Sequence, residues 1–129
     1  FLKWMSAEIA VYFTGIDPMV TMIALGAVYL YLHYMFATCA AHVVALYVPF
    51  VSIVIASGVP PLFAALVFGI LTNLMWGLTE YGSGPGPLYF GQGYFERPRF
   101  YGLSWVLVTF SLVVTIASGL VWWKVLALY

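Results

Sequence analysis

The chain has 129 residues, of which 65% are hydrophobic and only 6% are charged, and its net charge at pH 7 is zero. A soluble domain carries about 25% charged residues, so four basic and four acidic side chains cannot cover a water-facing surface of this size. The mean hydropathy of +1.07 predicts an integral membrane protein, and the lack of a basic cluster excludes nucleic acid as a partner.

The start of the chain shows no signal-peptide pattern, and its first residue is Phe1. We interpret the chain as the C-terminal part of a longer protein. Residues 1–17 contain three charged side chains among apolar ones. They are predicted to form either an interfacial helix or the end of a preceding span, and both alternatives remain open.

The next part, residues 18–57, is predicted to form a helical hairpin. Residues 18–79 contain no Asp, Glu, Lys or Arg, and one helix of that length would be roughly 90 Å long. The hydrocarbon core is only about 30 Å thick, so the chain must reverse at least twice. We expect one reversal at residues 37–42, where small and polar side chains gather, and another at 57–61. At the first, either two spans meet at a membrane surface, or a hairpin turns inside the membrane.

Residues 58–99 are predicted to form a discontinuous helix. Pro60 and Pro61 start a span that reaches Thr79. Residues 82–87 then contain three glycines and two prolines, a composition that excludes regular helix. Glu80 is expected at the membrane surface, because an ionised group in mid-membrane costs several kcal/mol.

The last part of the chain, residues 100–129, is predicted to contain the final transmembrane helix. We expect a solvated corner at residues 96–99 and then a span over 103–123. Two tryptophans and Lys124 form an interfacial anchor at its end.

Two breaks in apolar helices, at residues 37–42 and 82–87, are the candidate binding features. A helix end inside a membrane leaves backbone N–H groups unpaired, and these attract anions. Each break has a hydroxyl residue, Thr38 or Ser83. The alternatives are close helix packing by small residues at the first break and an ordinary surface loop at the second.

The chain contains no Ser-His-Asp set, CxxC pair or HExxH motif, so we predict that it is not an enzyme. Cys39 is expected to be a small buried side chain. His33 and His42 would lie on opposite faces of a continuous helix. A shared metal site is therefore expected only if the chain turns between them, and packing is the preferred role for His33.

Three stretches resemble the divalent anion:sodium symporter family, and in particular its branch of 2-oxoglutarate/malate translocators and citrate/succinate-type antiporters. Residues 31–42 (YLHYMFATCAAH) resemble the branch's hairpin motif, residues 72–87 resemble its "SNL…LTHYGTGPAP" stretch, and residues 89–94 (YFGQGY) resemble its "YFGSGY" ending. The likeness runs from about residue 19 to 124. It implies an all-α fold of two inverted repeats, each with a re-entrant hairpin and a discontinuous helix. This chain would supply the second repeat's hairpin, its broken helix and the final transmembrane helix.

The resemblance also implies the site. The family's hairpin tip binds a substrate carboxylate and helps to form a sodium site. The matching positions here are Thr38, Cys39 and Ala40, and Ala40 lacks a hydroxyl. This departure favours sodium-independent exchange over a sodium site near Thr38 and Ser83. The predicted substrate-binding residues are Thr38, Cys39, Ala40, Gly82, Ser83, Gly84 and Pro85.

The resemblance implies transport of di- or tricarboxylates of the malate, 2-oxoglutarate, succinate or citrate type, without a cofactor and with sodium as a candidate coupling ion. The full-length protein would include an N-terminal repeat and form a homodimer in a bacterial inner membrane or a plastid inner envelope. The alternative hypothesis is a small, non-transporting accessory subunit of a membrane complex.

Overall fold

The computed structural model describes residue 11 and residues 15–128, so most of the predicted element at 1–17 lies outside the described residues. The described residues form helices and no strands, which confirms the all-α prediction. The helices in chain order are α2 (Pro18–Tyr31), η1 (Leu32–Met35), α3 (Cys39–Ala56), α4 (Pro61–Leu74), η2 (Met75–Gly77), α5 (Gly86–Gly91) and α6 (Arg97–Val125).

The α2–α3 hairpin has a side-chain cap at the start of each of its helices. The Asp17 carboxylate accepts hydrogen bonds from the N–H groups of Met19 and Val20, at 2.8 and 3.2 Å. Such a cap satisfies N–H groups that have no partner within the helix. The chain reverses at residues 36–38, and the Thr38 hydroxyl caps α3. We call residues 36–40 the hairpin tip.

The second reversal leads into α4 and falls at residues 57–60, where Gly58 adopts a φ of +106° that favours glycine. The helix from Pro61 ends with η2 at Gly77, two residues before the predicted Thr79. Residues 78–85, which we call the break, then separate η2 from α5.

The prediction of irregular structure at 82–87 was partly wrong, and the corner predicted at 96–99 contains the start of a helix. Helix α5 begins at Gly86 and α6 at Arg97, so Pro87 and Pro98 lie in first turns. Proline is tolerated there because its missing N–H would have no helical partner. Helix α6 is 29 residues long, about 43 Å. Among the residues that the structure describes, three helical segments are long and apolar enough to cross a membrane, namely residues 18–35, 39–56 and 97–125, while Pro61–Gly77 is shorter.

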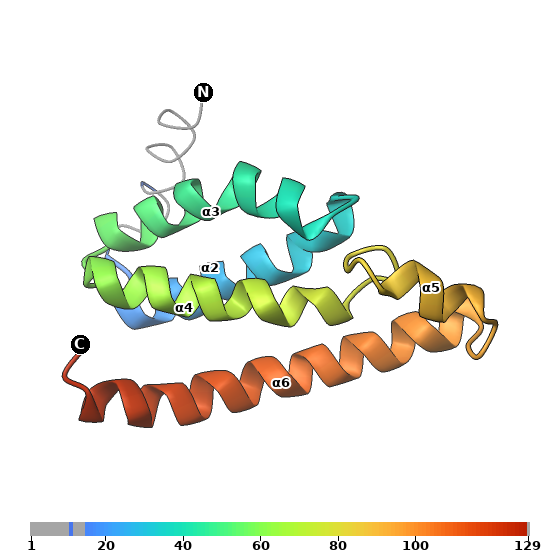
Figure 1. Cartoon of the computed structure of the whole chain (residues 1–129). Helices are drawn as coiled ribbons and strands as arrows, with labels where there is room; N and C mark the ends of the chain where they lie inside the picture. The colour runs from blue at the N-terminus through green and yellow to red at the C-terminus, as the bar shows by residue number, and fades with distance from the viewer. Residues whose placement is uncertain (1–10, 12–14, 129) are drawn as a thin grey trace.

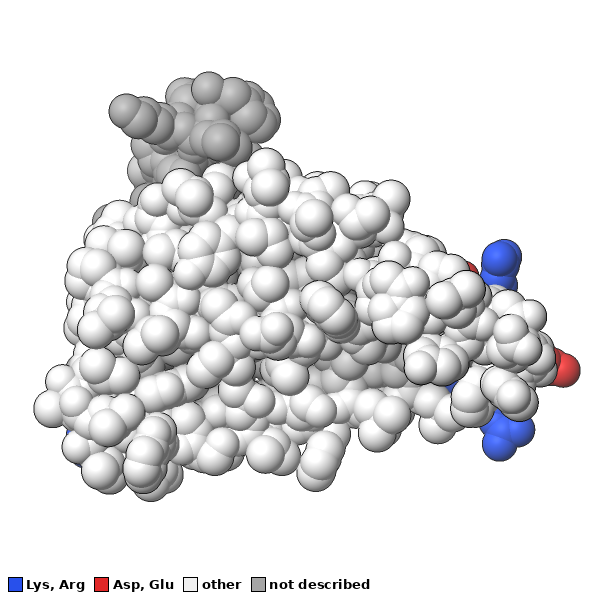
Figure 2. Space-filling view, viewed as in Figure 1, with Lys and Arg blue, Asp and Glu red and all other residues white. Residues whose placement is uncertain are grey.

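Helices α2, α3 and α4 pack pairwise against one another, and α6 packs along α4 (Figure 1). The Tyr29 ring lies in the centre of this packing, with centroids 5.6 Å from Phe50 and 5.2 Å from Phe68. Figure 2 shows a surface with few charged side chains, and these gather mainly at the end that contains the start of α6. Large apolar side chains on α6, including Trp105 and Phe110, are exposed. This surface suits lipid or other apolar protein segments.

The arrangement brings the hairpin tip and the break to the same end of the molecule (Figure 1). The two segments are about 40 residues apart in sequence, and they meet because α2 and α3 pack against α4 over their length.

Candidate functional site

The hairpin tip presents one hydroxyl side chain at the start of an 18-residue helix. Thr38 is exposed, and its hydroxyl oxygen accepts a hydrogen bond from the Ala41 N–H at 3.1 Å. A hydroxyl that accepts one bond can still donate another. Ala40 is exposed as well, whereas Cys39 is buried with 8% exposure. The Cys39 side chain, expected to be a small buried group, therefore points inward while Thr38 faces outward.

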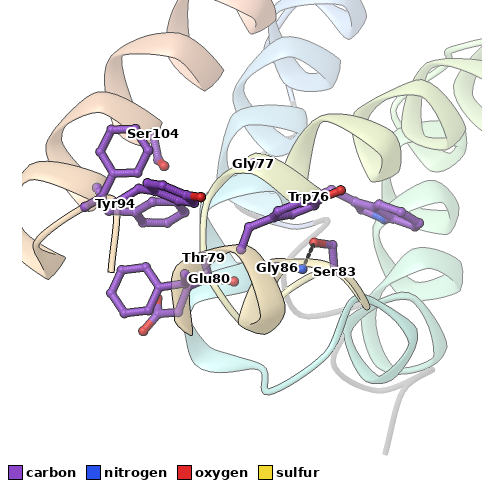
Figure 3. Close-up of a pocket in the computed structure, with 12 residues that line it drawn as sticks. Trp76, Gly77, Thr79, Glu80, Ser83, Gly86, Tyr94 and Ser104 are labelled. Atoms are coloured by element: carbon purple, nitrogen blue, oxygen red, sulfur yellow. Dashed lines mark hydrogen bonds between the residues drawn. The ribbon is translucent and has the colours of Figure 1, made fainter. Parts of the chain in front are cut away.

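The break consists of two tight turns. The Gly82 N–H donates to the Thr79 carbonyl at 3.3 Å, and the Gly86 N–H donates to the Ser83 carbonyl at 3.2 Å. The Ser83 hydroxyl also accepts from the Gly86 N–H at 3.2 Å (Figure 3). Gly82 is buried and Ser83 is half-buried, while Gly84 and Pro85 are exposed. The exposed residues of the break are therefore Tyr81, Gly84 and Pro85.

His33 lies where the hairpin meets the break. Its Nε2 atom is 3.3 Å from the Thr79 Oγ1 atom and 3.8 Å from the Cys39 Sγ atom. A Cβ atom added to Gly82 would lie only 2.6 Å from the same Nε2 atom. Two predicted site residues, Cys39 and Gly82, therefore contact one imidazole from opposite segments.

The two histidines are neighbours, because the helix ends at Met35 and the chain turns between them. Their ring centroids are 5.5 Å apart. Both rings are fully buried, and His42 packs edge-on against Tyr29 with centroids 4.5 Å apart. No group of three His, Cys, Asp or Glu side chains within the described residues could hold a metal ion. His33 thus makes a hydrogen-bond contact with Thr79, whereas the contacts of His42 that we describe are ring packing.

A pocket of about 460 Å³ lies between the break, α5 and the start of α6. Half of its lining residues are aromatic, including Trp76 and Tyr94 (Figure 3). Glu80 also lines it, with a side chain that is only 12% exposed because other parts of the chain cover it, and its place at the membrane surface stays a prediction. The Arg97 Nε atom lies 3.6 Å from the Glu80 carboxylate and balances its charge.

The sequence matches, over residues 1–129, the family described as "Sodium:sulfate symporter transmembrane region". The chain belongs to this family. It is therefore an integral membrane segment of a symporter-family protein, as the motifs in the hairpin and the break predict.

Curated relatives of this symporter-family chain are named as carboxylate transporters. Dicarboxylate transporter 1, chloroplastic, from Spinacia oleracea is 36% identical over 115 residues, which cover 89% of this chain and 20% of the relative. Dicarboxylate transporter 2, chloroplastic, from the same plant is 40% identical over 105 residues, 81% of this chain and 19% of the relative. The L-tartrate/succinate antiporter of Escherichia coli (strain K12) is 31% identical over 129 residues, 99% of this chain and 26% of the relative. The chain thus spans about a fifth to a quarter of these relatives' lengths.

The sequence did not point to Thr79 as a site residue, and packing was the preferred role for His33. These two side chains connect the hairpin of the symporter-family segment to its break, although they are 46 residues apart. No local pattern relates positions at such a separation, so the link becomes visible only in the packed structure.

Proposed function

We propose that the complete protein is a secondary transporter of di- or tricarboxylates and that this chain supplies one half of its substrate site. The observation that carries the proposal is the meeting of the hairpin tip and the break at one end of the fold, where both segments contact His33. The printed names of the relatives, which are dicarboxylate transporters and an antiporter, support the substrate class.

Binding would need no covalent chemistry. The Thr38 hydroxyl and the first-turn N–H groups at Cys39 and Ala40 would donate to one substrate carboxylate. The partial positive charge at the start of α3 favours an anion there. Ser83 would donate from the other side, and the exposed backbone at residues 84 and 85 would complete the pocket. The other carboxylate would be bound by the upstream repeat, and the hairpin would move against a scaffold during transport.

We propose that the protein transports by exchange, with malate, 2-oxoglutarate, succinate or citrate as substrates. A sodium site at the tip needs oxygen ligands, and Ala40 supplies no side-chain oxygen. The family description names sodium, so sodium-coupled uptake is the competing mode. We further propose a homodimer in a bacterial inner membrane or a plastid inner envelope.

The test is transport by the full-length protein in proteoliposomes. Vesicles loaded with malate, or left empty, receive external labelled malate, with and without an inward sodium gradient. We expect uptake that requires internal malate and ignores sodium. Sodium-driven uptake into empty vesicles would show symport instead, and the lack of uptake of every tested di- and tricarboxylate would contradict the function.

The accessory-subunit hypothesis is separated from transport by the coding DNA upstream of Phe1. An open frame of several hundred codons with a second Ser/Thr-rich hairpin supports the transporter. A start codon within a few residues of Phe1 would support the accessory subunit.

A further inference from the structure

We propose that His33 is a positioning residue, which fixes the separation between Thr38 at the hairpin tip and the Gly82–Pro85 segment of the break through its contact with Thr79. This inference rests on the proposed function, because the two segments are its two sources of substrate donors. His33 itself does not touch the substrate.

The first argument is burial. The His33 side chain has 0% exposure, and burying an imidazole is unfavourable unless it is hydrogen-bonded. Its Nε2 atom has two polar neighbours, the Thr79 hydroxyl at 3.3 Å and the Cys39 thiol at 3.8 Å, while its Nδ1 atom has no partner within the described residues. The polar contacts of the ring are thus concentrated on the atom that faces both segments.

The second argument is the position of Thr79, which is itself only 2% exposed. Its side chain contacts His33, while its carbonyl accepts the N–H of Gly82 and closes the first turn of the break. The side chain therefore binds the hairpin, and the backbone of the same residue shapes the break. A shift of the imidazole must move this turn.

The third argument is the lack of free space. A methyl group at Gly82 would lie 2.6 Å from His33 Nε2 and 2.7 Å from Thr79 Oγ1. On the hairpin side, Cys39 contacts the ring and directly follows Thr38 in the chain. The imidazole is therefore tightly enclosed between the tip and the break. Donors held at a fixed separation bind a ligand more tightly, because less freedom is lost on binding.

The experiment uses the full-length protein in proteoliposomes, with any cysteine other than Cys39 replaced. The variants are His33→Leu, His33→Gln, Thr79→Val and the double variant His33→Leu/Thr79→Val. Tyr31→Phe is the matched control, because it removes a side-chain hydrogen bond to Thr109 in α6 from the same helix end. The two measurements are KM and maximal rate for labelled malate exchange, and the alkylation rate of Cys39, located by peptide mass spectrometry.

We expect His33→Leu and Thr79→Val each to raise KM about tenfold with a smaller change in maximal rate, and to speed Cys39 alkylation. The double variant should resemble either single variant, since both remove one contact. His33→Gln should stay close to the parental protein, because its amide can reach the position of Nε2. Tyr31→Phe should leave both measurements unchanged.

A parental KM together with a protected Cys39 in Thr79→Val would overturn the proposal. This test remains possible even if His33→Leu fails to fold, because valine is nearly isosteric with threonine and Thr79→Val is expected to fold. Additive effects in the double variant would overturn it as well. If the parental protein exchanges no carboxylate, the proposed function fails and the role in substrate binding fails with it. Faster Cys39 alkylation in the same variants would then still support the contact between hairpin and break.

Discussion

Replacing Gly82 with alanine tests the contact between the hairpin and the break. The added methyl carbon would lie 2.6 Å from the His33 Nε2 atom and 2.7 Å from the Thr79 Oγ1 atom. Ordinary van der Waals contact begins at 3.4 Å, so one segment must move by about 0.8 Å. Neither neighbour can rotate into solvent, because His33 is 0% and Thr79 is 2% exposed. Overpacking of this kind costs about 1–3 kcal/mol.

The matched control is Gly84→Ala, in the same segment, because nothing lies within 4 Å of the Cβ atom that it would add. We expect Gly82→Ala to lower the unfolding temperature of the solubilised full-length protein and to raise the KM for malate exchange about tenfold, since about 1.4 kcal/mol corresponds to one factor of ten. Gly84→Ala should leave the unfolding temperature unchanged, because its methyl group meets no neighbour. Parental stability and KM in Gly82→Ala would refute the close contact that we describe.

Three further substitutions test other parts of the molecule. Thr38→Asp should keep the cap on α3, because Asp is at least as good an N-cap as Thr, yet abolish malate exchange by placing a negative charge at the anion site; parental exchange would contradict the site. Thr21→Val should raise the free energy of unfolding by about 1 kcal/mol in thermal or chemical denaturation, since it removes a buried hydroxyl without a partner in the described residues; a loss of stability would be contrary to this reasoning. Arg97→Gln should cost less than about 1 kcal/mol in the same assay, because Arg97 is 74% exposed and solvent weakens its pair with Glu80; a loss above 2 kcal/mol would show a stronger pair.

The reversals of the chain were predictable from length alone, because the uncharged stretch from 18 to 79 is too long to be a single span of the bilayer. The helix starts were harder to predict. Proline interrupts a helix interior but is favoured in a first turn. Pro87 was therefore predicted to lie in irregular structure and Pro98 in a solvated corner, and the structure places them in the first turns of α5 and α6.

The site was predictable in its local parts only. The capping of a helix by the Thr38 hydroxyl is predictable from the preference for Thr at helix starts, and the turns at residues 79–86 are predictable from the glycines and prolines. The proximity of His33 to His42 did not follow, because the helical period was applied across a segment in which the helix ends. The contact of His33 with Thr79 depends on how α2, α3 and α4 pack, which no spacing in the sequence records.

The length of α6 can be compared with the thickness of a bilayer, and this comparison indicates how deep the helices packed against α6 lie. From Arg97 to Lys124 the helix rises about 40 Å, close to the thickness of a bilayer with its headgroups. Gly77, the last residue of η2, packs near Val108, since a Cβ atom added to it would lie 3.2 Å from the Val108 Cγ2 atom. Val108 is about 16 Å along the axis from Arg97. If Arg97 lies at headgroup level, we expect the helix that starts at Pro61 to end about 16 Å deeper, near the bilayer midplane.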